Sequence, residues 1–147
     1  MPRRLDERPN VGRVHGAWGE DVAVAQLEVE GLVIIERNVR PCKDDKRIEI
    51  DAIAYDRKRD ILIFVEVKQH AARSERQSRL RSLTKRKQEL LRRGCRAWIL
   101  RNKWQGAYRF DVIEVYGVPD ARAVAEVDHI RHVRLFADRE HFVNWEE

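Results

Sequence analysis

The chain has 147 residues, a length that suits a single domain around one hydrophobic core. It contains no apolar run long enough for a membrane-spanning helix, and its charged N-terminus lacks the apolar stretch of a secretory signal. We therefore expect a cytoplasmic protein with no membrane partner, in which residues 1–11 form a flexible tail and residues 12–147 form one domain.

The positive charge is concentrated in one segment of the chain. The formal net charge is +5, but residues 68–109 contain 14 of the 30 basic residues and only 2 of the 25 acidic ones, a net charge of +12. The other 16 basic and 23 acidic residues leave −7. A segment of one sign creates a local positive field whose natural partner is a polyanion, most commonly nucleic acid. A solvated, arginine-rich face without a ligand has the same composition and stays open as the alternative.

The first half of the chain predicts one helix followed by three strands. Apolar residues recur at helical spacing from Gly12 to Glu30, and Gly31 stands where a helix usually ends. Runs that are β-branched or alternate between apolar and polar residues then predict strands over residues 32–40, 47–55 and 61–68. The polar residues between the last two of these strands predict a hairpin turn.

The second half predicts one more helix and further strands. Thr84 can cap a helix that runs to Arg93, with Gly94 as its stop signal. Apolar or alternating runs predict a fourth strand over residues 97–100 and a fifth over residues 108–116. A weaker strand is predicted over residues 129–135, and a last short helix over residues 142–145. The resulting order α-β-β-β-α-β-β predicts an α/β fold with a mixed central sheet of about five strands flanked by helices.

Three side chains that carry chemistry should meet on this sheet. Glu66 and Lys68 are two residues apart on a predicted strand, so both leave the same face, and Asp51 lies on the neighbouring strand of the hairpin. Carboxylate oxygens are ligands that Mg²⁺ and Mn²⁺ prefer, a bound metal activates water, and a lysine can stabilise developing charge. The pattern predicts a metal-dependent phosphodiesterase site, although a solvent-exposed Glu66–Lys68 ion pair needs no such function.

Two helix residues are further candidates for this site. Glu20, on the first helix, can reach the same metal from the side, whereas most helix glutamates face solvent. Lys87 falls on the helix face that should be apolar, so it either extends into solvent or points toward phosphate at the metal site. The basic side chains expected to bind nucleic-acid phosphates are Arg73, Arg76, Arg79, Arg81, Lys85, Arg86 and Lys87.

Short motifs follow one another between residues 12 and 115. In chain order they are Gly19-Glu20, Arg37-Asn38, Glu49-Ile50-Asp51, Ile53-Ala54, Phe64-Val65-Glu66-Val67-Lys68, Thr84 with Lys87-Gln88, and Arg109-Phe110-Asp111-Val112. Together they resemble the YraN-like family of small bacterial proteins. That family looks like a branch of the PD-(D/E)XK nuclease superfamily, close to the archaeal Holliday-junction resolvases.

The resemblance implies a restriction-endonuclease-like core with Asp51, Glu66 and Lys68 as the active-site triplet. It also implies that Glu20 is an accessory acid, so that the expected ligands of Mg²⁺ or Mn²⁺ are Asp51, Glu66 and Glu20. The substrate-facing loop after Lys68 is shorter and richer in arginine than is usual in the family.

Other residues and partners also follow from the resemblance. Lys87 is expected to be a base near the site, and a homodimer is consistent with the dimers that resolvase-like proteins form. Arg109 and Asp111 match a motif without an assigned chemistry, and we expect them to hold the fourth and fifth predicted strands together.

Three classes of function follow from the sequence. The leading hypothesis is a Mg²⁺- or Mn²⁺-dependent endonuclease that hydrolyses DNA, with branched and single-stranded substrates both left open. The alternative is a nucleic-acid-binding module without hydrolysis that uses the basic segment 68–109, since phosphate contacts need no metal. A third class is an interaction protein, because the four tryptophans could serve an interface.

Overall fold

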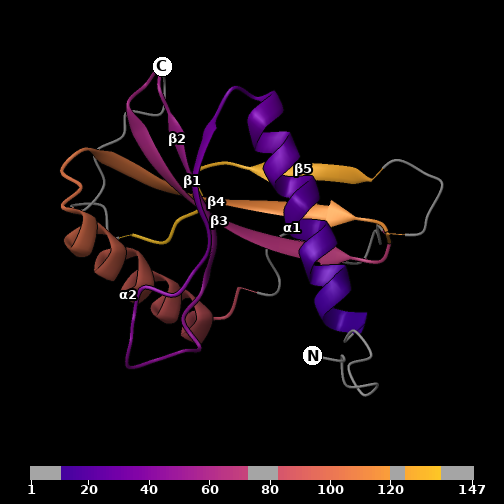
Figure 1. Ribbon diagram of the computed structural model, residues 1–147, viewed down its shortest axis with the longest axis horizontal. Coiled ribbons are helices and arrows are strands. Elements are labelled where there is room, and N and C mark those ends of the chain that lie inside the picture. Colours follow the sequence, from indigo (N-terminus) through magenta and orange to yellow (C-terminus); the bar gives the residue numbers. More distant parts are fainter. Residues whose placement is uncertain (1–10, 73–82, 120–124, 137–147) are drawn as a thin grey trace, which may run out of the picture.

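The computed structural model describes residues 11–72, 83–119 and 125–136, and Figure 1 shows their arrangement. This part of the chain forms two helices and five strands, in the order α1 (Val11–Val29), β1 (Val33–Val39), β2 (Ile50–Asp56), β3 (Ile61–His70), α2 (Lys85–Asn102), β4 (Ala107–Tyr116) and β5 (Glu126–Ile130). The predicted helix over residues 142–145 lies outside the described residues, as does the predicted tail up to residue 10. Neither α1 nor α2 is long and apolar enough to cross a membrane.

The strands β1 to β5 join one sheet in their sequence order. The first three are antiparallel neighbours, β4 pairs with β3 in parallel, and β5 pairs with β4 antiparallel. Parallel neighbours cannot be joined by a tight turn, and α2 forms the crossover between β3 and β4. The predicted fold class is therefore confirmed: a mixed five-stranded sheet with helices, in the order α-β-β-β-α-β-β.

The two helices cover opposite faces of the sheet. Phe64 of β3 belongs to one core cluster with Leu91 and Trp98 of α2, whereas its neighbour Ile63 belongs to another with Leu27 of α1. Successive residues of a strand point to opposite faces, so both faces of β3 are buried. This explains why the strand begins with an unbroken apolar run and why the charged residues that follow are unusual.

The N-terminal elements agree closely with the prediction. α1 is followed by Gly31, which has a φ of 86° and donates its N–H to the Glu28 carbonyl at 2.9 Å. This is the left-handed C-terminal cap that a glycine at this position predicts. β2 begins at Ile50, later than predicted, and β3 extends to His70 because its parallel pairing with β4 continues that far.

The second helix is longer than predicted, and the strand predicted over residues 97–100 is wrong. α2 includes both Gly94, the predicted stop, and the apolar run that follows it. Thr84 does cap the helix, since its side chain accepts a hydrogen bond from the Lys87 N–H at 3.2 Å. The left-handed residue that ends α2 is Lys103, with a φ of 52°.

Gly94 serves packing rather than helix termination. A Cβ atom at this position would lie 2.6 Å from Cγ2 of the buried Ile48, so a glycine lets α2 approach the segment before β2. The buried stripe of α2 continues past Gly94, from Leu91 through Cys95 to Trp98. A short apolar run is compatible with a helix or a strand, and the continuation of this stripe at helical spacing decides for the helix.

The last two strands of the sheet therefore correspond to the predicted fifth strand and to the weaker strand that follows it. The strand predicted over residues 108–116 is confirmed as β4. β5 overlaps only the beginning of the weaker strand predicted over residues 129–135. It ends at Ile130, and His132 then takes a φ of 61°, which is incompatible with an extended strand.

Replacing Gly94 with alanine is expected to destabilise the protein, although alanine favours a helix interior over glycine by about 1 kcal/mol. The added methyl group collides with Ile48, and overpacking a core costs about 1 to 3 kcal/mol. Urea denaturation should show a free energy of unfolding lower by about 1 kcal/mol. Gly16→Ala on α1 is the control, because a Cβ there meets nothing within 4 Å. A Gly94→Ala variant as stable as the wild type would contradict this interpretation.

Candidate metal centre

Three carboxylates meet where α1 passes the start of β2. Glu20, Glu49 and Asp51 each offer an oxygen atom, and these oxygens lie within 4.8 Å of one another. Glu20 comes from α1, Asp51 from β2, and Glu49 from the residue just before β2. All three side chains are partly exposed, so a hydrated ion can reach them.

Asn38 of β1 holds two of these carboxylates in place. Its Nδ2 donates hydrogen bonds to Glu20 Oε2 at 2.7 Å and to Glu49 Oε1 at 3.2 Å. Asn38 has a φ of 51°, a left-handed conformation that asparagine adopts more readily than most residues. Beside it, Arg37 forms an ion pair with Asp21 of α1 at 2.6 Å. The Arg37-Asn38 motif therefore fastens β1 to α1 next to the carboxylates.

Removing the Asn38 amide is expected to weaken metal binding about tenfold, because the two glutamates lose their shared donor. Asn38→Gly is the informative variant, since glycine accepts the positive φ without strain. Calorimetric titration with Mn²⁺ should show the loss, and the far-ultraviolet circular dichroism spectrum should remain that of the wild type. An unchanged Mn²⁺ affinity would show that Asn38 does not position the ligands.

Gly19 lets α1 come close to the end of β3. A Cβ atom at this position would lie only 2.5 Å from Oε1 of Gln69. Because Gly19 immediately precedes Glu20, the close approach brings the Glu20 carboxylate toward the sheet. The Gly19-Glu20 motif thus combines a packing residue with a candidate ligand.

Glu66 is a buried carboxylate placed between two lysines. Its Oε1 lies 3.3 Å from Lys68 Nζ and 2.9 Å from Lys87 Nζ. Glu66 and Lys68 share one face of β3, as predicted, but they are not a solvent-exposed pair, because Glu66 is only 5% exposed. Lys87 comes from the first turn of α2 and points toward Glu66. Of the two predicted alternatives, the structure therefore shows a lysine that points toward the site and not one that extends into solvent.

Asp51 connects the carboxylate cluster to Glu66 and its lysines. Its Oδ2 accepts a hydrogen bond from the Val67 N–H at 2.8 Å. Burial, followed by the negative charges of Glu66 and Glu20, raises the pKa of Asp51 to about 8 despite that hydrogen bond. Burial and the repulsion between the carboxylates therefore both favour the protonated form of Asp51. A divalent cation relieves the same repulsion, and an all-oxygen set of ligands suits Mg²⁺ or Mn²⁺.

The two lysines differ in how firmly they keep their charge. Burial lowers the pKa of Lys68, and the neighbouring Lys87 lowers it further, by more than Glu66 restores. Burial also opposes the charge of Lys87, but Glu66, with smaller contributions from Lys68 and Asp51, raises the pKa of Lys87. Lys87 is therefore the more strongly charged partner of Glu66, and Lys68 is the one that loses its proton more easily.

The structure brings Asp51, Glu66, Lys68 and Glu20 together, and their roles in chemistry stay predictions. The residue that sequence reasoning missed is Glu49, which completes the carboxylate cluster with Glu20 and Asp51. Glu66 is adjacent to Asp51, but its Oε1 contacts the lysines. A signal for Glu49 was present, because it precedes Asp51 by two residues in an alternating run and so points to the same side.

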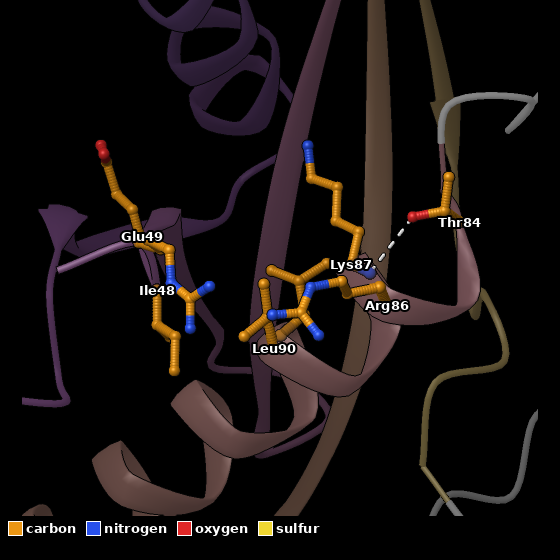
Figure 2. Close-up of a pocket in the computed structure, with 8 residues that line it drawn as sticks. Ile48, Glu49, Thr84, Arg86, Lys87 and Leu90 are labelled. Carbon is orange, nitrogen blue, oxygen red and sulfur yellow. Dashed lines mark hydrogen bonds between the residues drawn. The ribbon is translucent and has the colours of Figure 1, made fainter. Parts of the chain in front are cut away.

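Only some of the cations expected to bind phosphate lie in the described residues. Lys85, Arg86 and Lys87 form the first turn of α2, and the first two of them are exposed. Figure 2 shows Arg86 and Lys87 on the wall of a cavity next to the site. The predicted phosphate-binding residues that lie outside the described residues are Arg73, Arg76, Arg79 and Arg81.

The Arg109–Asp111 motif lies on the α1 face of the sheet, opposite to Glu66. Arg109 Nε lies 3.1 Å from Asp111 Oδ1, and Asp111 also accepts the His132 N–H at 3.0 Å and contacts His129 Nε2 at 2.7 Å. Burial opposes the charge of Asp111, but the hydrogen bond to His129 and the charge of Arg109 lower its pKa. The motif therefore joins β4 to β5, not to the predicted strand over residues 97–100, which is helical.

The fold and the site define an α/β protein that carries a carboxylate cluster beside a buried glutamate–lysine group. A family model described as "Uncharacterised protein family UPF0102" matches residues 19–115. The chain belongs to this family, which confirms the YraN-like resemblance. The matched range begins at Gly19 and includes the carboxylate cluster, Asn38, Glu66 and both lysines.

Relatives from several organisms match most of the chain. A UPF0102 protein of Herminiimonas arsenicoxydans is 38% identical over 110 residues, which cover 74% of this chain and 83% of the relative. A UPF0102 protein of Aliivibrio salmonicida is 34% identical over 115 residues, covering 76% and 87%. A UPF0102 protein of Beutenbergia cavernae is 38% identical over 120 residues, covering 80% and 93%.

Proposed function

We propose that this protein is a divalent-metal-dependent nuclease of the PD-(D/E)XK type that hydrolyses phosphodiester bonds in DNA. The observation that carries the proposal is the position of Asp51. This one side chain belongs to the carboxylate cluster with Glu20 and Glu49, and it lies against Glu66, which is bound to two lysines. Oxygen ligands and ammonium groups side by side support hydrolysis of a phosphodiester, because a bound metal activates water and the ammonium groups stabilise developing charge.

Each residue has a definite part in this proposal. Glu20, Glu49 and Asp51 hold Mg²⁺ or Mn²⁺, with Glu66 as a further ligand on the Asp51 side. The bound metal supplies Lewis acidity and lowers the pKa of water. Lys68 orients the attacking water and stabilises the charge that develops on the phosphate. Lys87 forms an ion pair with Glu66 and adds a second positive charge near the phosphate.

The basic segment supports nucleic acid as the substrate. It contributes Lys68 and Lys87 to the site, and Lys85 and Arg86 extend its positive charge onto the exposed first turn of α2. Phosphate contacts from such residues supply affinity that is independent of sequence. A homodimer is a separate proposal from the resemblance to resolvases, and sedimentation at high concentration tests it.

The test is a cleavage assay on supercoiled plasmid, single strands, a flap and a four-way junction, each with Mg²⁺, Mn²⁺ or EDTA. We expect the wild type to cut with either metal, EDTA to stop cleavage, and Glu66→Gln to lose activity by at least about a hundredfold, the loss expected for a catalytic group. Glu89→Gln is the matched control, since Glu89 is an exposed carboxylate of α2. Absence of metal-dependent cleavage on every substrate would refute the nuclease.

A nucleic-acid-binding module without hydrolysis is the second candidate, favoured by the charge of segment 68–109 alone. It predicts that DNA binding and its salt dependence survive replacement of Asp51 and Glu66. It also predicts that no heat of Mg²⁺ or Mn²⁺ binding appears in a calorimeter. The nuclease predicts a heat of binding that those replacements abolish.

A further inference from the structure

A cavity opens directly beside the candidate metal centre. Its volume is about 300 Å³, and it lies between the segment before β2 and the first turns of α2. Two of its lining residues also belong to the site: Glu49 is one of the clustered carboxylates, and Lys87 contacts Glu66. Figure 2 shows the Glu49 and Lys87 side chains extending toward the same side of this cavity. The cavity and the candidate metal centre are therefore direct neighbours.

The walls of the cavity combine an apolar surface with positively charged side chains. Ile48, Leu90 and Leu91 supply the apolar surface, and Arg47 and Arg86 supply guanidinium groups. Arg47 is held by Asp45 through Nε to Oδ1 at 2.9 Å and Nη2 to Oδ2 at 2.8 Å, so its planar group is fixed before any ligand arrives.

A nucleobase matches this chemistry. It is flat and largely apolar on its faces, it stacks on guanidinium planes, and it is joined to an anionic phosphate. The size of the cavity stands at the lower end of the range for small-molecule sites, so it suits one base rather than a helix or a strand of a partner.

We infer that this cavity binds the base of an unpaired nucleotide next to the scissile phosphate, and that the substrate is single-stranded or locally unpaired nucleic acid. A base inside a duplex is stacked and paired, so it must be extruded before it can enter, whereas an unpaired base enters freely. The inference rests on the proposed function for its link to cleavage. The binding of a base can be tested separately from cleavage.

The binding test uses an oligonucleotide and a strand of the same length in which every base has been removed. Both carry the same phosphates, so fluorescence anisotropy in EDTA measures only what the bases add. We expect the wild type to prefer the normal strand about tenfold, as for stacking of a single base. Leu90→Trp, which fills the cavity, should remove the preference. Leu100→Trp is the matched control, because Leu100 lies on the same helix and is 78% exposed.

A second pair of variants tests the cavity independently, in case Leu90→Trp does not fold. Arg86→Gln and Arg59→Gln each remove one exposed positive charge, but only Arg86 lines this cavity. Arg86→Gln should lower the preference for the normal strand, and Arg59→Gln should leave it unchanged. Equal binding of both strands by the wild type, or a preference that survives in both cavity variants, would overturn the inference.

Cleavage then separates this inference from the nuclease proposal. With an active enzyme, a single abasic residue moved along a DNA strand should suppress cutting when it stands at one fixed distance from the scissile bond. Cleavage that does not depend on the position of the abasic residue would contradict base binding in the cavity and leave the nuclease proposal intact. Preferential binding of the normal strand without any cleavage would support base binding in the cavity and contradict the nuclease proposal.

Discussion

Replacing Asp51 with asparagine is expected to make the metal-free protein more stable while it abolishes metal binding and cleavage. Burial and the nearby carboxylates raise the pKa of Asp51 to about 8, against about 3.9 in the unfolded chain. Asparagine keeps the shape of the side chain and an oxygen that can accept the Val67 N–H. It carries no negative charge, so the repulsion from Glu66 and Glu20 disappears.

The pH dependence of this effect has a definite sign. Between about pH 4 and pH 8 the folded wild type binds a proton at Asp51 that the unfolded chain does not, so its stability falls as the pH rises through that window. The side chain of asparagine does not titrate, so the variant has no such dependence at this position. The free energy of unfolding of Asp51→Asn should therefore exceed that of the wild type by an amount that grows from pH 5 to pH 8 and reaches about 2 kcal/mol.

Urea denaturation in EDTA at pH 5, 6.5 and 8 measures this difference. Mg²⁺ or Mn²⁺ should reverse the order, because a ligand stabilises only the protein that binds it. Asp44→Asn is the matched control, since the Asp44 side chain is 75% exposed and its replacement should show no such trend. A metal-free Asp51→Asn variant less stable than the wild type at pH 8 would contradict the unfavourable burial and repulsion of the Asp51 charge.

Lys68→Met is expected to reduce cleavage on the order of 10²- to 10³-fold, as removal of one group that stabilises transition-state charge does. Methionine keeps most of the length of the lysine stem and removes the charge beside Glu66. Lys85→Met is the control, since Lys85 is an exposed cation at the start of α2. Initial rates at saturating Mg²⁺, with binding measured separately, show whether the loss lies in chemistry. Equal losses in the two variants would mean that Lys68 contributes only general positive charge.

Lys87→Met tests how the two lysines are coupled. Lys87 is one of the causes that lower the pKa of Lys68, so its removal raises that pKa. If charged Lys68 is the active form, cleavage is lost as the pH rises through the pKa of Lys68. The alkaline limb of the rate profile should therefore move to higher pH in Lys87→Met. A limb that stays in place, or moves to lower pH, would show that Lys68 does not act as a cation.

Local patterns in the sequence were sufficient to place the central side chains of the candidate site relative to one another. Alternation along a strand placed Glu66 and Lys68 on one face, and a short polar turn placed Asp51 on the neighbouring strand. The same kind of local signal located the Thr84 cap and the strand that became β4. These features depend on residues a few positions apart, where backbone geometry alone determines which side chains share a face.

Long-range packing decided the rest. Asn38 binds Glu20 across 18 residues of sequence and brings Glu49 into the cluster, and no local pattern indicates that contact. Gly94 has the local pattern of a helix stop, but it lies inside α2. Glycine is needed there because Ile48, far away in the sequence, leaves no room for a Cβ atom. The apolar run over residues 97–100 suits a strand as well as a helix, and burial of Trp98 against Phe64 made it helical. The free energy that distinguishes these alternatives comes from contacts between distant segments, which exist only once the sheet and helices have assembled.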